Sequence, residues 1–170
     1  DILKDNIEND YVELSNINDN IKNAIISIED KNFYTHKGFD YLRILKAILV
    51  NIKSGKIKQG ASTISQQYVK NLYLTFDKTW NRKIEEALLT LELETHYSKD
   101  EILEGYLNTI DFSAGNYGIK DASKYYFNKE PKDLTLAESA ILVGIPRNPS
   151  YYNPINNYDA AKKRQKEVLE

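Results

Sequence analysis

Apolar residues recur every three or four positions over most of this sequence, which is the period of an α-helix. In the first such segment Ile21, Ile25 and Ile28 share one face. Asp19 can cap the amino end of this helix, which is expected to end near Glu29. The same spacing predicts further helices over residues 40–53, from Ser62 or Thr63 to Tyr73, from Thr79 to Tyr97, from Ile119 to Phe127 and over 159–170.

Two more helix starts carry the pattern of a capping box, in which a hydroxyl residue is followed three positions later by glutamate. The pairs are Ser98 with Glu101 and Thr135 with Glu138, and Gly144 is a suitable stop for the second of these helices. The chain has neither an internal repeat nor a segment that alternates between polar and apolar residues. We therefore predict a mainly α fold, with room for one short hairpin.

Composition indicates one folded domain. The 170 residues are enough for a sizeable core, and 41% hydrophobic with 28% charged residues excludes wholesale disorder. A net charge of −2 provides no overall basic field, so no nucleic-acid partner is expected. Cysteine is absent, which excludes thiolate zinc sites and a cysteine nucleophile. Methionine is absent even at position 1, so we expect a domain excised from a longer chain.

The segment EDKNFYTHKG gathers Glu29, Asp30 and His36 around Phe33 in an expected loop. A carboxylate beside an aromatic ring can acquire the raised pKa that general acid or base catalysis requires. Two simpler interpretations stay open. The segment can be a helix end with solvated charges, and the histidine can be held by a structural hydrogen bond.

A second polar segment, QGASTISQQYVKN, stands at the expected start of a helix. It combines two hydroxyls with two amides, those of Ser62, Thr63, Gln66 and Gln67, and Lys70 adds a charge. Such groups at a helix amino end suit a hydroxyl-rich or anionic ligand. The simpler interpretation is a polar helix entry capped by Ser62, with both glutamines in solvent.

Charged residues also follow one face of the helix expected after Thr79. Lys78, Arg82 and Glu86 recur at intervals of four, while Glu85 points elsewhere. A cationic stripe that ends in a carboxylate suits a phosphorylated substrate and brings a second acid to the site. Ion pairing within the helix is the simpler explanation.

The helix expected over 40–53 has a wide apolar face and is followed by the basic run KSGKIKQG. An apolar face beside Lys53, Lys56 and Lys58 suits a helix that lies on an anionic lipid surface. A helix that packs against the protein core is the commoner cause of this pattern.

Together and in this order, these segments strongly resemble the peptidoglycan glycosyltransferase domain of class A penicillin-binding proteins and monofunctional transglycosylases, glycosyltransferase family 51. The resemblance covers about residues 20–155. The five motifs of that family stand here as EDKNFYTHKG, GASTISQQ with YVKN, RKIEEALLTLELE, EILEGYLNTIDFSAGNYGIKDASKYYF and LTLAESAILVGIPRNPSYYNP. Five motifs in order are far more specific than any one of them.

The resemblance implies a mainly α fold with a lysozyme-like larger lobe, a smaller membrane-proximal jaw lobe and a substrate cleft between them. The chain, 1–170, would be a single glycosyltransferase domain with its jaw region at about 40–58. An N-terminal segment outside this sequence would anchor it at the outer face of the bacterial cytoplasmic membrane.

The resemblance also implies roles for individual residues. Glu29 matches the catalytic base of the family and Glu86 its second important glutamate. The implied substrate-binding residues are Asp30, Phe33, His36, Lys46, Ser62, Thr63, Gln66, Gln67, Lys70, Lys78 and Arg82. Lys70, Lys78 and Arg82 fall where the family places basic residues near the lipid pyrophosphate. Lys46 and Lys78 stand where arginine is frequent, and lysine lacks the bidentate fork that grips phosphate oxygens.

The implied reaction extends a growing lipid-linked glycan with lipid II, forms a β-1,4 link with inversion and releases undecaprenyl pyrophosphate. It would serve peptidoglycan synthesis, cell wall biogenesis and cell shape. Mg²⁺ or another divalent cation is an implied aid, and moenomycin-type antibiotics are implied inhibitors. Two alternatives remain: a lysozyme-like lytic enzyme, which would not require the cationic cluster, and a catalytically silent module that binds lipid II or peptidoglycan.

Overall fold

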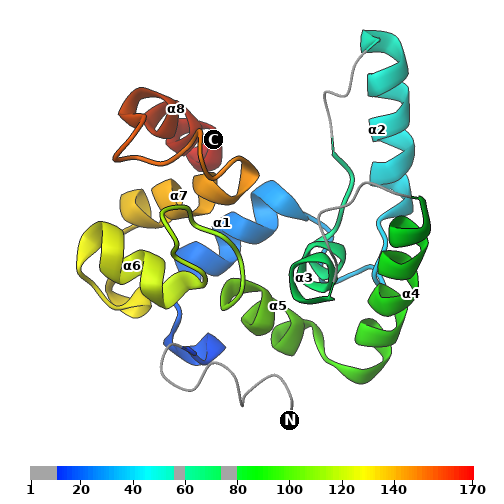
Figure 1. Cartoon of the computed structure of the whole chain (residues 1–170), viewed down its shortest axis with the longest axis horizontal. Coiled ribbons are helices and arrows are strands. Elements are labelled where there is room, and N and C mark those ends of the chain that lie inside the picture. Colours follow the sequence, from blue (N-terminus) through cyan, green and yellow to red (C-terminus); the bar gives the residue numbers. More distant parts are fainter. Residues whose placement is uncertain (1–10, 56–59, 74–79) are drawn as a thin grey trace.

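The computed structural model describes residues 11–55, 60–73 and 80–170 (Figure 1). Within these ranges the chain forms eight α-helices, three short 3-10 helices and no β-strand. The α-helices are α1 Asp19–Glu29, α2 Tyr41–Ser54, α3 Ile64–Tyr73, α4 Trp80–His96, α5 Lys99–Leu107, α6 Ile119–Phe127, α7 Leu136–Gly144 and α8 Tyr158–Leu169. The 3-10 helices are η1 Leu14–Asn16, η2 Pro131–Asp133 and η3 Ile145–Arg147. The predicted mainly α fold is confirmed.

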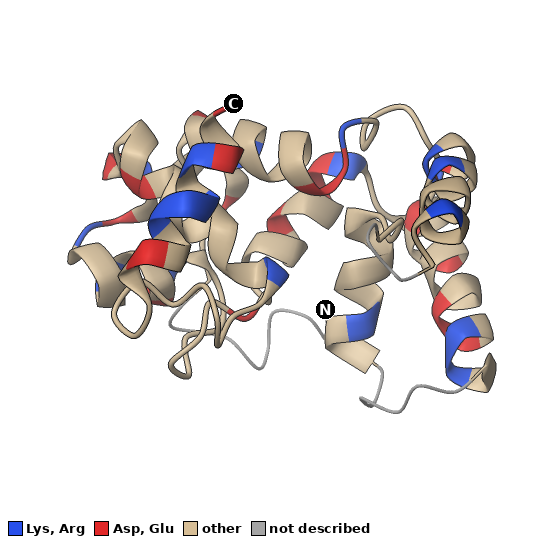
Figure 2. Cartoon of the chain, turned by 90° about the horizontal axis from the view of Figure 1, so that it is seen from above, with Lys and Arg blue, Asp and Glu red and all other residues tan. Residues whose placement is uncertain are grey.

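The helices lie in two groups with α3 and α5 between them (Figure 1). α7 packs against both α1 and α8, and with α6 these helices occupy the left-hand side of the view. α2 and α4 lie on the right-hand side, where α4 packs against α3. The view from above shows the same division, with acidic and basic residues mixed over both groups (Figure 2). Because α3 also packs against α5, it lies at the junction between the groups.

The hydrophobic core is built mainly from α1, α3, α5 and α7. Ile21 and Ile25 are fully buried one turn apart on α1, as the helical spacing predicts. Each such side chain contributes roughly 1.5–3 kcal/mol when it is buried. The other large side chains that are fully buried include Phe33, Ile64, Ile102, Leu103, Tyr106, Leu107, Phe112, Ile119, Leu142 and Ile145. The elements that carry Glu29, Gln66 and Gln67, helices α1 and α3, are therefore fixed by packing.

Both predicted capping boxes are confirmed. The hydroxyl of Ser98 accepts a hydrogen bond from the backbone N–H of Glu101, whose carboxylate accepts one from the N–H of Ser98. Thr135 and Glu138 make the same exchange at the start of α7, which ends at Gly144 as predicted. Each box satisfies two backbone N–H groups that a helix start leaves without an internal partner.

The predicted cap of α1 is wrong by one residue. The side chain of Asn18, rather than that of Asp19, accepts the hydrogen bond from the backbone N–H of Asn20. Asn18 also donates to the carbonyl of Leu134, 2.9 Å away. A cap that binds a distant segment cannot be distinguished from its neighbour by local sequence, since both residue types cap well.

The hairpin for which the sequence left room is reduced to one isolated antiparallel bridge, between Asp111 and Tyr117, within the described residues. The chain then turns sharply at Gly118, which has a φ of +90°. A Cβ atom at this position would lie 2.7 Å from the carbonyl oxygen of Asn108. Glycine is therefore required here by both the backbone conformation and the close approach.

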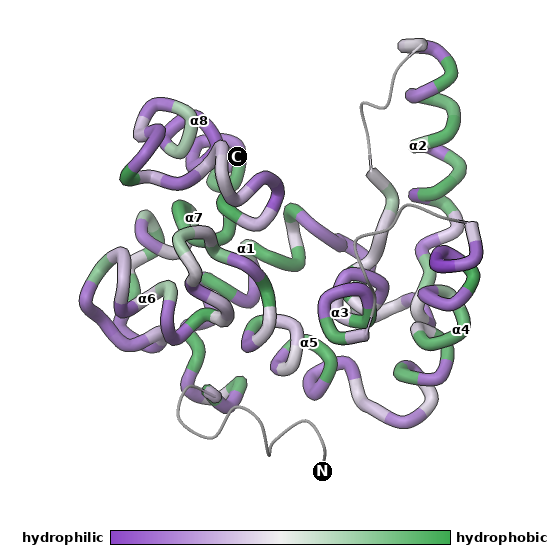
Figure 3. Tube along the Cα trace, in the orientation of Figure 1, coloured by the Kyte–Doolittle hydropathy of each residue, from purple (hydrophilic) through white to green (hydrophobic). Residues whose placement is uncertain are grey.

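Helix α2 exposes its apolar face. Ala47 is the buried residue of this helix, whereas Leu42, Leu49 and Ile52 are 68%, 66% and 73% exposed. The helix projects away from the other helices, and its trace is largely hydrophobic (Figure 3). The pattern read from the sequence therefore does not reflect packing against the core of this chain. Lys53 is exposed in the last turn, and Lys56 and Lys58 lie outside the described residues.

Helix α4 also exposes an apolar face. Trp80, Ile84, Leu88 and Leu91 share a face, and all four side chains are exposed. The buried residues of the helix are Glu86, Thr90 and Leu93. The inward side of α4 thus carries Glu86 and Thr90 together with Leu93, and the buried Glu86 requires partners there. No helix within the described residues is long and apolar enough to cross a bilayer.

We predict that Glu138→Gln lowers the free energy of unfolding at neutral pH by about 1 kcal/mol, since it weakens the capping box. Hydrogen bonds from the Thr135 backbone, and then from Lys129, lower the pKa of Glu138. Because the folded pKa lies below the unfolded one, the carboxylate stabilises the protein above the unfolded pKa, and this contribution is lost as the pH falls through the folded pKa.

Urea denaturation from neutral to acidic pH measures this difference. The gap between the wild type and Glu138→Gln should close on acidification, whereas Glu92→Gln, a change at an exposed position of α4, should have little effect throughout. A gap that stays constant with pH would contradict the assignment to the carboxylate.

Candidate active site

Glu29 is the last residue of α1, and its side chain is half-buried. The side-chain nitrogen Nε2 of Gln67, on α3, donates a hydrogen bond to Oε2 of Glu29 at 3.1 Å. The guanidinium of Arg43, on α2, donates to the main-chain carbonyl of Glu29. Three helices therefore meet at this residue, which explains why its carboxylate has a defined position at a helix end.

Glu86 lies on the inner side of α4 and is 2% exposed. Arg82, one turn earlier, approaches its Oε2 atom to 3.1 Å, and Lys83 forms an ion pair with Oε1. Gln66, on α3, donates to the same Oε1 atom at 3.4 Å. The ion pairing within the helix that the sequence suggested is therefore real, and it takes place around a buried carboxylate.

The two consecutive glutamines of α3 thus face one glutamate each. Gln66 is buried, and its Oε1 atom accepts from the backbone N–H of Thr63 while its own N–H donates to the Thr63 hydroxyl. This reciprocal pair caps α3. The simpler interpretation from sequence is wrong on both counts, because Thr63 rather than Ser62 is the cap and neither glutamine is a solvated side chain.

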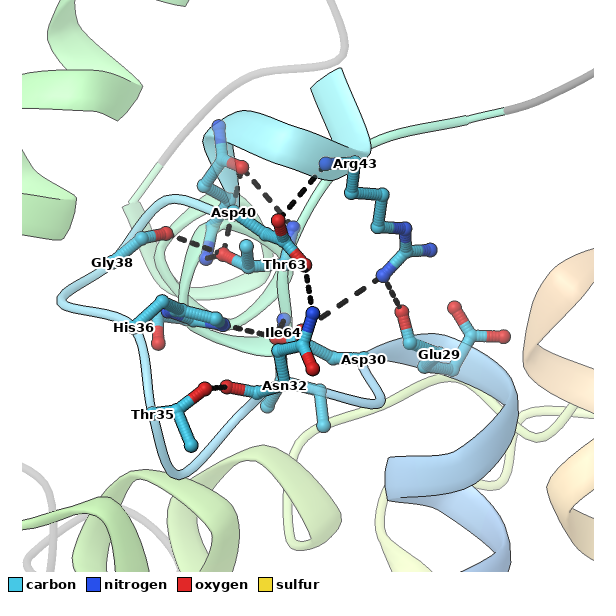
Figure 4. Close-up of polar contacts among 12 residues, drawn as sticks. Glu29, Asp30, Asn32, Thr35, His36, Gly38, Asp40, Arg43, Thr63 and Ile64 are labelled. Carbon is cyan, nitrogen blue, oxygen red and sulfur yellow. Dashed lines mark hydrogen bonds and ion pairs between the residues drawn. The ribbon is translucent and has the colours of Figure 1, made fainter. Parts of the chain in front are cut away.

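Asp30 fastens the loop after α1 to the amino end of α3 (Figure 4). Its carboxylate is fully buried and accepts from the backbone N–H of Ile64 at 3.0 Å. The same oxygen, Oδ2, lies 2.8 Å from Nε2 of His36, and Oδ1 lies 3.9 Å from Arg43. A carboxylate at a helix amino end satisfies a free N–H and interacts favourably with the helix dipole.

The rest of this loop, residues 31–40, is held by polar contacts with its neighbours (Figure 4). The hydroxyl of Thr63 donates to the carbonyl of Gly38 at 2.7 Å. Asn32 donates to Asp40, which caps α2 by accepting from the backbone N–H of Arg43. Hydrogen bonds from the Arg43 backbone and then from Asn32 lower the pKa of Asp40. The loop is therefore an ordered support for the site.

Phe33 belongs to this loop, and its side chain is fully buried. Its ring packs edge-on against Tyr34 and His36, and the ammonium group of Lys99 lies 4.6 Å from the ring centroid. Phe33 is thus a core side chain that supports the loop from below, and the aromatic ring of the motif does not border open solvent.

The sequence matches the transglycosylase family over residues 2–170. This chain belongs to that family. The resemblance inferred from the five motifs is therefore confirmed, as is the expectation of an enzyme of the transglycosylase class.

Several penicillin-binding proteins are similar to this transglycosylase chain. It is 55% identical over 159 residues to penicillin-binding protein 2D of Bacillus subtilis (strain 168), which is 94% of this chain and 23% of that protein. Identity is 42% over 169 residues, 99% of this chain and 27% of the relative, for penicillin-binding protein 4 of the same organism. For penicillin-binding protein 1A of Neisseria lactamica the identity is 47% over 160 residues, which is 94% of this chain and 20% of the relative. The chain spans about a quarter of the length of these relatives.

The structure brings most of the predicted residues of the transglycosylase site into three hydrogen-bonded sets around the start of α3. These sets are Glu29 with Gln67, Asp30 with His36, and Thr63 with Gln66, Glu86 and Arg82. Asp30, Phe33 and Thr63 have no exposed surface, so the structure gives them supporting contacts rather than surfaces for a substrate. Lys46, Ser62 and Lys70 are exposed. Lys78 lies outside the described residues.

Sequence reasoning missed three residues of this transglycosylase site. Lys83 was hidden by the i, i+4 pattern, because it reaches Glu86 from three positions away. Arg43 precedes Lys46 by three positions on α2, and only the folded loop shows that it reaches Glu29. Tyr106, whose hydroxyl donates to Oε1 of Gln67 at 3.0 Å, lies on α5, a helix whose start the sequence predicts without indicating a contact with the site.

The environments of the two glutamates differ in a way that matters for proton transfer. Arg82 and Lys83 pair with the two oxygens of Glu86, which is 2% exposed, so a bound hydroxyl has little access to this carboxylate. Glu29 receives a neutral amide donor and keeps part of its surface open. Of the two, Glu29 is the better placed to exchange a proton with a bound hydroxyl.

The described residues contain no group of three or more acidic, histidine or cysteine side chains that could hold a metal ion. Mg²⁺ prefers carboxylates together with substrate phosphates, and the Glu86 carboxylate already faces Arg82, Lys83 and Gln66. We assign no step to a metal ion, and the Mg²⁺ requirement stays a prediction.

We predict that Asp30→Asn lowers the free energy of unfolding by roughly 2–3 kcal/mol, because the amide is neutral and, with its oxygen kept at Ile64 and His36, turns a donor NH₂ group toward the Arg43 guanidinium. Thermal or urea unfolding measures the loss. The exposed Asp133, changed to Asn, is the matched control and should shift stability by less than about 0.5 kcal/mol. Equal stability of the two variants would show that the buried network contributes little.

Proposed function

We propose that this transglycosylase chain is a peptidoglycan glycosyltransferase that polymerises lipid II. The observation that carries the proposal is the pair of glutamates on either side of α3, each bound by one of two adjacent glutamines. The family membership and the cationic groups around Glu86 support the same reaction, since a pyrophosphate leaving group needs positive charge rather than a proton.

In the proposed reaction Glu29 accepts the proton of the 4-hydroxyl of the acceptor GlcNAc. As that proton leaves, the hydroxyl oxygen bonds to the anomeric carbon of the donor MurNAc, which belongs to the growing lipid-linked glycan. The bond from this carbon to the pyrophosphate oxygen breaks, and undecaprenyl pyrophosphate leaves with the electron pair. Attack from the opposite side inverts the carbon and gives a β-1,4 link.

Basic residues would receive the departing pyrophosphate. Lys46 and Lys70 are exposed on α2 and α3, and Lys78 precedes α4 in the sequence. Arg82 keeps 17% of its side chain exposed while it pairs with Glu86. In this assignment Glu86 holds Arg82 and Lys83 in place, so the cations are positioned before the charge develops.

The exposed apolar faces of α2 and α4 support a membrane surface as partner. Helical spacing places Lys46 and Lys53 along one edge of the apolar face of α2, the arrangement of a helix that lies in a lipid interface. Both helices lie on the same side of the molecule (Figures 1 and 2). We propose that this side is the jaw and faces the outer leaflet of the cytoplasmic membrane.

Polymerisation is tested with the purified protein and lipid II in detergent, with added Mg²⁺ and with a chelator. We expect long lipid-linked glycan from the wild type and a loss of at least about 100-fold in Glu29→Gln, which keeps the shape of the side chain but removes the base. A moenomycin-type compound should compete with lipid II. Cleavage of preformed peptidoglycan without polymer would favour a lytic enzyme, and binding without either reaction would favour a silent module.

The membrane surface is tested by flotation with vesicles that contain anionic lipid. We expect the double variant Leu42→Glu/Leu49→Glu to bind at least about tenfold more weakly, because two exposed apolar side chains of α2 are lost. Ile155→Glu changes an equally exposed apolar residue of the other helix group and should bind like the wild type. Equal binding of both variants would remove α2 from the membrane surface.

A further inference from the structure

We propose that Tyr106 is a positioning residue for Glu29, which it orients through the side-chain amide of Gln67. The proposal rests on the proposed function in one respect, the assignment of Glu29 as the proton acceptor. It adds to that function a chain of two hydrogen bonds that determines which oxygen of Glu29 receives the proton.

The chain runs from α5 through α3 to the end of α1. The hydroxyl of Tyr106 donates to Oε1 of Gln67 at 3.0 Å, and Nε2 of Gln67 donates to Oε2 of Glu29 at 3.1 Å. A side-chain amide has one oxygen that accepts and one NH₂ group that donates. Since the tyrosine hydroxyl occupies the oxygen, the NH₂ group must face the carboxylate.

Tyr106 is well suited to fix this direction. Its side chain is fully buried between the helices, and burial, followed by the charges of Glu29 and Asp30, raises its pKa well above the ordinary value of 10. The hydroxyl therefore keeps its proton throughout the working pH range and remains available as a donor. If the amide turned round, its oxygen would face an ionised carboxylate, and two acceptors would oppose each other without a hydrogen.

The arrangement makes the two oxygens of Glu29 unequal. Oε2 is engaged by Gln67, whereas Oε1 accepts no hydrogen bond from any described residue. Oε1 is therefore the oxygen that meets the acceptor hydroxyl. The other charged groups beside Glu29 are Asp30, next in the chain, and Arg43 from α2, which binds the main-chain carbonyl. Neither touches the amide, so a change at Tyr106 leaves both in place.

The kinetic test compares Tyr106→Phe, Gln67→Met and the double variant. Without the orienting hydroxyl the ionised form of Glu29 loses part of its hydrogen bond, so we expect kcat to fall about three- to tenfold and the acidic limb of its pH profile to move up by about half a unit. KM for lipid II should change little in Tyr106→Phe. The double variant should resemble Gln67→Met alone, since Tyr106 acts only through Gln67.

Tyr68→Phe is the matched control. Tyr68 is a neighbour of Gln67 on α3, is also buried, and its ring lies against Gly105 of α5. Like Tyr106→Phe, Tyr68→Phe removes a hydroxyl oxygen from the contact between α3 and α5. It leaves the two hydrogen bonds that connect Tyr106 to Glu29 unchanged. We expect an unchanged pH profile, and thermal unfolding should show that both Phe variants are folded. Fully additive effects in the double variant, or a pH profile that Tyr68→Phe moves equally, would overturn the proposal.

A second measurement does not depend on activity. In protein labelled with ¹³C at glutamate carboxyls, the Glu29 signal is identified by its loss in Glu29→Gln, and its titration midpoint is followed by NMR. The midpoint should rise in Tyr106→Phe and in Gln67→Met but not in Tyr68→Phe. Unchanged midpoints would overturn the positioning role even if lipid II is polymerised. Shifted midpoints without polymerisation would uphold it and refute the proposed function alone.

Discussion

A hydrogen bond from the backbone N–H of Ile64 to the buried carboxylate of Asp30 fixes the amino end of α3. Everything else in the site is arranged around this helix, because its first two turns carry Gln66 and Gln67. The bond joins α3 to the loop that follows α1, so Glu29 lies one residue from the same anchor. A carboxylate without exposed surface is costly unless all its contacts are made. The position of Glu29 therefore depends on the buried partner next to it in the chain.

Each glutamate accepts a hydrogen bond from a glutamine amide of α3, but the surroundings of the two carboxylates differ. Burial of Glu86 requires counter-charges, and Arg82 and Lys83 supply them from within α4. This places polar residues on the inner face of α4 and leaves Trp80 and its apolar companions outside. The rotation of α4 about its axis thus determines both features, because the orientation that buries Glu86 also exposes Trp80 and the apolar residues on its face. A helix packed in the usual sense would bury the apolar face and lose the anion.

Features that depend on local sequence were the predictable ones. The capping boxes at Ser98 and Thr135 and the bounds of α6 follow from residues within a few positions of each other. The cap of α1 was misplaced because Asn18 is selected by contacts with a segment more than 100 residues away. Tyr106 was not predicted as a site residue for a similar reason, since its hydrogen-bond partner on α3 is 39 residues away in the sequence. The motifs name residues that the fold brings close to α3, although only the fold shows which of them are buried supports.

Arg43 connects the apolar helix to the proposed proton acceptor. It stands in the first turn of α2, whose other contacts with the body are few because Ala47 is its buried residue. Through this side chain the amino end of α2 binds the carbonyl of Glu29, and through Asp40 the same end binds the loop that carries Asp30. Helix α2 is thus joined to the candidate site at its amino end, the end that carries Arg43. In the proposed function the substrate has both a lipid tail and a reactive sugar, and Arg43 joins the helix proposed to meet the lipid to the residue proposed to accept the proton.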